Sequence, residues 1–277
     1  MNDLVKYHND LNMVSMKKWS AEDMNFFFGI ISKIRNQGTK EMTLNTDEIK
    51  DLIDYSDRNY RWVATLDKIT DKIAGLRYVE RTSKRIANFA LFQRFIIDIE
   101  NKTLNVKVSD DFEYIVNKLT KNFTVYELTE FTSLKSVYSK TMYRILKQWR
   151  TTGSKEFKLD QFKDLLDVPV SYKANDIKKR VIKPIEKELP KYFNKFNVKI
   201  IKANTQGTPV IGYKFTWNPE KVPEKPEFVD DEYIKKTSKN RNISKIKNKK
   251  SKGSFSQKAR EERFKRILED REQGEEQ

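Results

Sequence analysis

Hydrophobic positions in the first 110 residues alternate between helical and strand-like spacing. Ser20 and Asp23 have the spacing of a capping box, and apolar residues then recur every three or four positions, which predicts a helix. In chain order, the pattern predicts a helix over Ala21–Arg35, a short strand over Glu41–Leu44, helices over Asp47–Asp54 and Arg58–Ala74 (the latter closed by Gly75 at C′), and strands over Leu76–Arg81, Phe89–Ile99 and Leu104–Val108. This order is that of a winged helix-turn-helix domain.

Part of this pattern returns later in the chain. Gly38–Leu44 is echoed by Gly153–Leu159, and Lys50–Asp54 by Lys163–Asp167. The separation is far longer than the roughly 20–50 residues of a solenoid repeat, so it indicates a duplicated domain.

The second copy predicts the same elements in the same order. They are a helix over Leu134–Trp149, a strand near Phe157, a helix over Asp160–Leu166, a helix from Asn175 or Asp176 to Leu189, and strands over Val198–Ile201 and Val210–Trp217. Pro184 falls inside the third helix, where we expect a kink, since the apolar period continues beyond it. The fold class is α+β, a tandem duplication of a winged helix-turn-helix domain.

The junction between the copies is expected near Lys121–Phe123, with helical segments on either side. Ser109 is followed by two aspartates, and Thr124 with Glu127 has capping-box spacing. We therefore expect a first domain over 1–123, a second over 124–219, and a basic, largely disordered tail over 220–277 with a helix at 256–271. Within that tail, Lys235–Lys252 carries nine basic residues and no acidic one.

Charge separates the two copies. The formal net charge of the 277 residues is +16. Residues 1–123 hold 20 Lys and Arg against 18 Asp and Glu, whereas 124–217 hold 19 against 9. A strongly basic domain attracts a polyanion by counterion release, so we expect double-stranded DNA as the partner of the second copy.

Candidate chemistry is sparse. The chain has no cysteine and one histidine, and none of its eight glycines precedes a lysine, so thiolate sites and a P-loop are excluded. A nicking enzyme would need a histidine pair for its metal. We expect no catalytic residue, metal or cofactor, and, without a signal peptide or a long apolar run, a cytoplasmic location and no membrane partner.

The third helix of the second copy is the expected DNA reader. At 100° per residue, apolar positions take one side and Lys179, Arg180, Lys183 and Lys187 take the other. Lys173 and Asn175 lie at its N-terminal end. Arg180 and Asn175 suit base edges, and the lysines suit phosphates. An ordinary solvated helix face is the alternative.

The first copy has a weaker basic surface. Arg58, Arg61 and Lys68 lie on or before its third helix, and the tip with Lys84 and Arg85 resembles a basic wing. We expect a secondary DNA contact here; its low net charge and many phenylalanines suit self-association equally.

The residues also carry a resemblance. Asn2–Asn12, Lys18–Phe27 and Lys178–Leu189, proline included, resemble segments of plasmid replication initiators from low-GC Gram-positive bacteria. The resemblance covers about 2–219. It implies two winged-helix domains that bind iterons, the direct repeats of a plasmid origin, with the second as the main reader and the first as the dimer interface.

The same resemblance implies a function and partners. Monomers would start theta replication by opening the origin and engaging host replication initiation proteins and the helicase-loading machinery, and homodimers in equilibrium with them would repress the initiator's own promoter. The alternatives are a tandem winged-helix transcriptional regulator and, less favoured, a relaxase or nickase.

Overall fold

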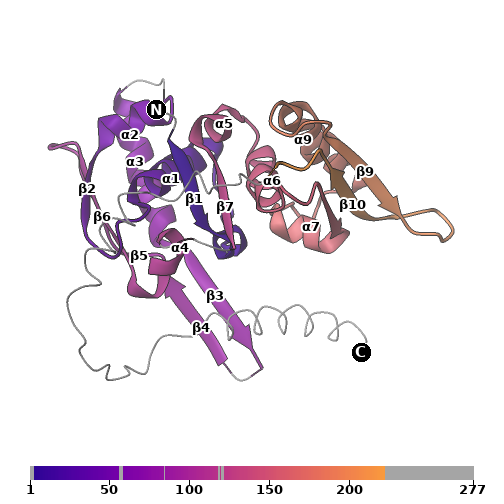
Figure 1. Ribbon diagram of the computed structural model, residues 1–277, viewed down its shortest axis with the longest axis horizontal. Helices are drawn as coiled ribbons and strands as arrows, with labels where there is room; N and C mark the ends of the chain where they lie inside the picture. Colours follow the sequence, from indigo (N-terminus) through magenta and orange to yellow (C-terminus); the bar gives the residue numbers. More distant parts are fainter. Residues whose placement is uncertain (1–2, 56–58, 84, 118, 120–121, 222–277) are drawn as a thin grey trace. The chain divides into compact units, whose positions relative to one another are not determined.

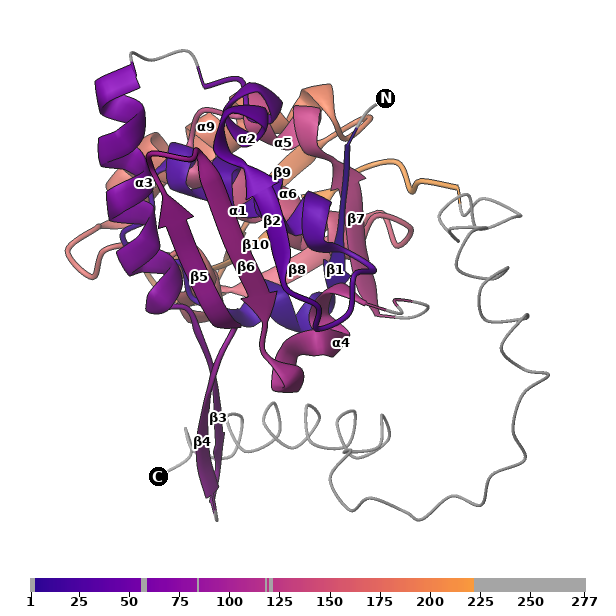
Figure 2. The same ribbon diagram turned by 90° about the vertical axis from the view of Figure 1, so that its left-hand side faces the viewer.

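The computed structural model describes residues 3–55, 59–83, 85–117, 119 and 122–221. The first copy follows the predicted order. Ser20 and Asp23 form the capping box, with the Asp23 N–H donating to Ser20 Oγ at 3.1 Å and the Ser20 N–H to Asp23 Oδ2 at 2.6 Å. Its helices are α1 (Ala21–Ile34), α2 (Thr46–Leu52) and α3 (Asn59–Ala74), and its three-stranded sheet contains β2 (Met42–Asn45), β5 (Phe92–Asp98) and β6 (Thr103–Val108) in the order β2-β6-β5 (Figure 2).

The second copy repeats this plan. Its elements are α6 (Val137–Gln148), β8 (Ser154–Lys158), α7 (Leu159–Leu165), the third helix, β9 (Asn197–Lys202) and β10 (Val210–Thr216), with strand order β8-β10-β9 (Figure 1). In both sheets the last strand in the chain lies in the middle. The first strand pairs with it on one side and the second strand on the other. The helix predicted from Leu134 begins three residues later, because Leu134 ends α5 (Leu128–Ser133) and Ser136 caps α6.

The echoed segments adopt the same backbone. Gly38 and Gly153 have φ of 68° and 73°, and Asp54 and Asp167 have φ of 52° and 51°. In each copy the left-handed aspartate ends the second helix in a Schellman motif, in which the N–H of the next residue reaches back five positions. These bonds are Tyr55 N–H to Lys50 O at 3.0 Å and Val168 N–H to Lys163 O at 2.9 Å. The duplication predicted from sequence is confirmed at this level.

The predicted junction is wrong in its secondary structure. Phe123–Glu127 is not a capped helix but strand β7, which pairs antiparallel with β1 (Leu4–His8), from Leu4 opposite Glu127 to His8 opposite Phe123. The Thr124 hydroxyl lies in this strand, where it donates to Asn9 Oδ1 at 2.8 Å and accepts from Asn12 Nδ2 at 3.0 Å. Tertiary bonding therefore decides this segment rather than its local spacing.

The long strand predicted over Phe89–Ile99 is two strands. β3 (Arg77–Thr82) and β4 (Arg85–Ala90) pair with each other in a two-stranded sheet, and β5 follows after Leu91, whose N–H bonds to Leu76 O at 3.4 Å. The pair β3 and β4 is thus inserted before the wing of the first copy, and the wing itself is β5–β6. The helix α3 ends at Ala74, as predicted, but Gly75 after it does not have the positive φ of a left-handed C′ glycine.

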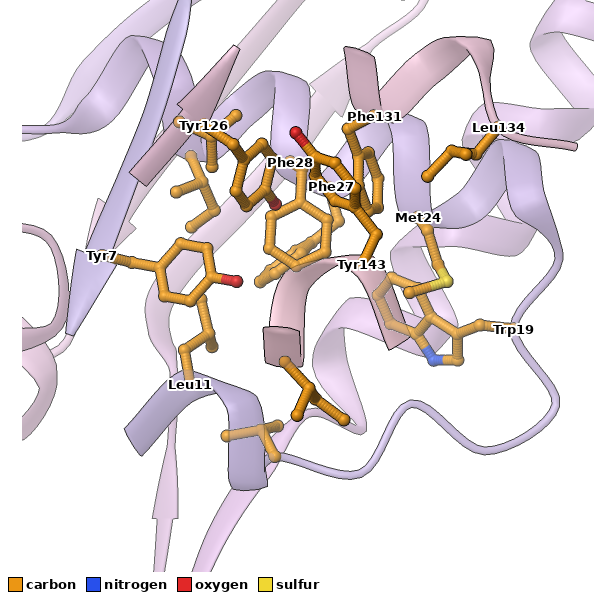
Figure 3. Close-up of a cluster of buried hydrophobic side chains, with 14 of the residues drawn as sticks. Tyr7, Leu11, Trp19, Met24, Phe27, Phe28, Tyr126, Phe131, Leu134 and Tyr143 are labelled. Atoms are coloured by element: carbon orange, nitrogen blue, oxygen red, sulfur yellow. The ribbon is translucent and has the colours of Figure 1, made fainter. Parts of the chain in front are cut away.

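Aromatic side chains from both copies pack in one core. Tyr126 on β7 lies 5.4 Å from Phe131 and 5.2 Å from Tyr143, and Phe28 on α1 lies 4.9 Å from Phe131, between ring centroids (Figure 3). Each of these rings is buried. The remaining short elements are η1 (Asn9–Met13), η2 (Asp110–Phe112), α4 (Glu113–Val116) and η4 (Leu189–Lys191).

Candidate nucleic-acid interface

The third helix of the second copy runs from Ala174 to Glu188 without a break. It consists of α8 (Ala174–Asp176), the π-helical segment η3 (Ile177–Ile182) and α9 (Lys183–Glu188). The Lys183 N–H bonds to Lys178 O, a π-type bond that comes just before Pro184, in the first turn of α9. The π turn lets the helix continue past a residue that lacks an N–H, so the helix does not restart at Pro184.

The two sides of this helix divide as predicted. Its apolar residues are buried with at most 3% exposure; they are Ile177, Val181, Ile182, Ile185 and Leu189. The six predicted DNA contacts are all exposed: Lys173, Asn175, Lys179, Arg180, Lys183 and Lys187. The helix therefore presents a cationic surface, which we call the reading face, while its other side anchors it to the core.

Arg180 differs from the lysines around it in having defined contacts. Its guanidinium carbon lies 5.3 Å from the centroid of the Tyr172 ring, and Nη1 lies 3.5 Å from the Tyr172 hydroxyl. Nε lies 3.8 Å from Asp176 Oδ1, one turn earlier. These neighbours raise the pKa of Arg180, with the Tyr172 hydroxyl as the largest influence, so it stays a cation under all ordinary conditions.

A fifth lysine joins the reading face from outside this helix. Lys135, just before α6, lines an open groove of about 470 Å³ together with Lys179, Lys183 and Lys187. Glu188 also lines the groove, and its Oε2 accepts from the N–H groups of Lys135 and Ser136 at 3.1 and 3.3 Å. That contact fixes the start of α6 beside the third helix, which we call the reading helix. Lys135 was not predicted, because nothing in the sequence relates it to residues almost fifty positions later.

The wing of the second copy adds further cations that were not predicted. Lys199 on β9 lies opposite Lys214 on β10, and Lys202 lies opposite Val210 at the end of the pairing. Lys199 and Lys202 are exposed. The sequence offers no clean signal for them, because the two lysines are three positions apart with Ile200 and Ile201 between them.

The first copy presents fewer cations on its third helix. Trp62, Leu66, Ile69 and Ile73 are buried, and Arg61 and Lys68 are exposed on the other side. Lys72 instead turns to the start of α1, where its Nζ bonds to Asp23 Oδ2 and, at 3.3 Å, to Lys18 O. Arg58 and Lys84 lie outside the described residues, and for Arg85 only the strand position in β4 is described.

Polar side chains of α6 bind the first copy. Lys140, fully buried, donates from Nζ to Phe131 O at 2.5 Å and to Asn25 Oδ1 on α1 at 2.6 Å. Arg144, 2% exposed, donates to Leu11 O at 3.1 Å. The first helix of the second copy is thus bonded to the N-terminal segment and to α1.

Metal clusters and membrane-spanning helices are absent from the described ranges. No cluster of three or more histidine, cysteine or carboxylate side chains suited to a metal occurs there, and no helix there is long and apolar enough to cross a membrane. The predicted basic run at Lys235–Lys252 and the helix at 256–271 lie in 222–277, outside the described residues.

Comparison with known proteins agrees with this architecture. The family model described as Initiator Replication protein, WH1, matches residues 4–147, and that described as Initiator Rep protein, WH2, matches residues 158–217. The fold is similar to that in the crystal structure of Pi initiator protein in complex with iteron DNA, with a TM-score of 0.63 over 80% of this chain and 99% of that one, at 13% identity. The low identity makes this a likeness of fold.

A curated relative is similar over much of the sequence. The probable replication protein rep of Bifidobacterium longum (strain NCC 2705) is 35% identical over 192 residues, which are 68% of this chain. The chain spans 64% of the length of that relative. Because the WH1 model alone matches more than half of the residues and the WH2 model matches 158–217 of the second copy, this chain belongs to the family of initiator replication proteins.

Proposed function

We propose that this chain is a plasmid replication initiator that binds the direct repeats (iterons) of an origin sequence-specifically, starts theta replication there and represses its own promoter. The observation that carries the proposal is the reading face, a row of exposed cations on a helix whose opposite side is anchored in the core. Such a helix suits the major groove of DNA. The Pi initiator, whose fold is similar, has a crystal structure in complex with iteron DNA.

Within the reading face we assign two kinds of contact. Arg180 and Asn175 would pair with base edges, since arginine suits guanine and asparagine suits adenine. Lys173, Lys179, Lys183 and Lys187 would contact phosphates, joined by Lys135 across the groove. The wing lysines, Lys199 and Lys202, would contact the phosphate backbone of the DNA beside this helix.

The first copy would act as a secondary DNA contact and as the homodimer interface. Its basic residues for this role are Arg58, Arg61, Lys68, Lys84 and Arg85. We further propose a monomer–dimer equilibrium, contact of the monomer with host initiation and helicase-loading proteins, and a domain division near Phe123. The proposed role is non-enzymatic and cytoplasmic, since an initiator of this kind remodels DNA by binding it.

Titration of Arg180→Ala tests the base-reading assignment. A duplex selected by the full chain from a random library serves as probe, and Arg94→Ala, an exposed arginine paired with Glu41, serves as control. Arg180→Ala should weaken binding to the selected duplex by roughly tenfold to a hundredfold and relax its specificity, whereas the control should bind as the wild type does. An unchanged affinity for Arg180→Ala would refute the assignment.

A transcriptional regulator without initiator activity is the second candidate, and replication in trans separates the two. An initiator should select tandem direct repeats and maintain an origin plasmid that lacks its own initiator gene. A regulator should select an inverted site and fail to maintain the plasmid.

A further inference from the structure

Arg180 stands on the reading face beside an aromatic ring and a carboxylate. Long flexible side chains lose rotamer freedom when they bind, and a guanidinium must present its fork in the plane of the base to pair with guanine O6 and N7. A side chain already held near that geometry loses less on binding. The contacts of Arg180 are of this holding kind.

Tyr172 contacts the guanidinium in two ways. The ring lies under it, 5.3 Å from centroid to guanidinium carbon, and the hydroxyl accepts from Nη1 at 3.5 Å. Cation–π contact and hydrogen bond come from one side chain, so the guanidinium is restrained both in distance and in direction. Arg180 still keeps 64% of its side chain exposed.

Tyr172 is itself fixed by its surroundings. Its N–H bonds to Pro169 O at 2.9 Å in the turn before the helix, and its ring packs against the core. Burial, and after it the neighbouring Tyr172, raise the pKa of Tyr138 on α6. The ring is therefore held by the turn before the helix and by the core of the same domain.

Asp176 restrains the other end of the guanidinium. Its Oδ1 lies 3.8 Å from Arg180 Nε, while its Oδ2 accepts from the Lys173 N–H at 3.2 Å. The carboxylate is thus bonded to the backbone at the start of the helix. A guanidinium has five N–H donors, and of these only one on Nη1 is hydrogen-bonded, to Tyr172, while the contact with Asp176 is an ion pair, so the fork can still pair with a base.

We propose that Tyr172 and Asp176 are positioning residues that hold the Arg180 guanidinium for bidentate pairing with a guanine. This proposal rests on the proposed base-reading role of the third helix of the second copy, the recognition helix. Tyr172 provides the surface on which the fork lies, and Asp176 sets its rotation about the long axis of the side chain. Sequence discrimination at one base pair then depends on residues that need not contact DNA.

A double-mutant cycle in the full chain tests the proposal. The readout is the affinity ratio between a library-selected duplex and the same duplex with the guanine opposite Arg180 replaced; Tyr192→Phe, beyond the C-terminal end of the helix, is the matched control. Tyr172→Leu should lower this ratio about fivefold and leave the salt dependence unchanged, and Tyr172→Phe, which keeps the ring, should lower it less. In the Arg180→Ala background, Tyr172→Leu should change nothing further.

Two results would overturn the positioning role. One is an equal loss of affinity for both duplexes, and the other is the same loss from Tyr172→Leu with and without Arg180. Thermal melting will show whether Tyr172→Leu unfolds the domain, and in that case the surface variant Asp176→Asn decides instead. Asp176→Asn should raise the affinity for every duplex, because it removes a negative charge, yet lower the affinity ratio about twofold. An unchanged ratio would refute the proposal. A ratio insensitive to Arg180→Ala would refute base reading itself, which is a distinguishable failure.

Discussion

The third helices of the two copies occupy the same place in a duplicated fold and differ in what they expose. The reading helix has Lys179, Lys183 and Lys187 at intervals of four, all exposed. On α3 the exposed side combines Arg61 and Lys68 with Asp71, and Lys72 bonds to Asp23 and the Lys18 carbonyl. Both helices bury apolar residues against the core, so the two copies share this scaffold and differ in the residues on the exposed side.

The first helices of the two copies, α1 and α6, differ in their buried residues. Phe26, Phe27 and Phe28 on α1 are fully buried, and this helix is held by apolar contact. On α6, the buried positions include Lys140, Arg144 and Lys147. Hydrogen bonds from Lys140 and Arg144 to Leu11, Asn25 and Phe131 require particular partners, which apolar packing does not. The second copy thus places basic residues both on the exposed side of its third helix and in its interior, where Lys140 and Arg144 contact the first copy.

The largest expected effect comes from removing the lysine row. Lys179→Gln/Lys183→Gln/Lys187→Gln should weaken binding to every duplex about a hundredfold at physiological salt and reduce the slope of log K against log salt by about 2 to 3, because each phosphate contact releases about 0.9 counterion. Arg61→Gln/Lys68→Gln in the first copy should lower affinity less than about tenfold. Titrations at several salt concentrations measure both. Equal losses would show that the copies share DNA binding evenly.

The echoed glycines allow a comparison at one position of the fold. A Cβ on Gly153 would lie 2.6 Å from Pro219 Cγ and 2.9 Å from Trp217 O, whereas one on Gly38 would meet Glu113 Oε1 at 3.9 Å. Both residues have positive φ, so alanine is strained in each. Gly38→Ala should lower the free energy of unfolding by about 1 kcal/mol and Gly153→Ala by about 2–4 kcal/mol, since overlap adds to strain. Urea unfolding measures the difference, and similar values would contradict the packing described for Pro219.

The sequence predicted what depends on local periodicity and missed what depends on distant partners. The apolar side of Ile177–Leu189 and the paired segments around Gly38 and Gly153 are visible as spacing and repetition, and they are confirmed. Strand β1 is not visible, because Leu4–His8 is short and its partner β7 begins 115 residues after it ends. The same limit hid the groove of Lys135, since Lys135 precedes α6 and the lysines it meets lie on the third helix, more than forty positions later.

Burial of Lys140 makes the contact between α6 and the first copy sensitive to pH. Burial lowers its pKa from 10.5 to about 7, against an opposing influence of Glu188 and with a smaller one of Lys135 in the same direction. Between these two values the unfolded chain binds the extra proton, so the free energy of unfolding rises with pH. Below pH 7 both states hold the proton and the dependence fades.

Comparison with Lys140→Met isolates this group from the others that titrate. From pH 7 to 8, the free energy of unfolding of the wild type should rise relative to that of Lys140→Met by about 1 kcal/mol. Parallel urea titrations at each pH measure the difference. A constant difference would mean that Lys140 keeps its proton through its bonds to Asn25 and Phe131. No position of α1 in the first copy should behave in this way, because its buried residues are mainly apolar.

The smallest expected effect concerns Lys135, which tests whether the reading surface extends beyond one helix. If the groove between the start of α6 and the reading helix receives a phosphate, Lys135→Gln should weaken binding to all duplexes about fivefold and reduce the salt slope by about 1, without changing the order of preference among sequences. Lys102→Gln, at the exposed pair with Asp47 in the first copy, is the control and should leave the slope unchanged. Equal slopes for Lys135→Gln and the wild type would confine the phosphate contacts of this region to the recognition helix, and the difference between the copies would then rest on that helix and the wing alone.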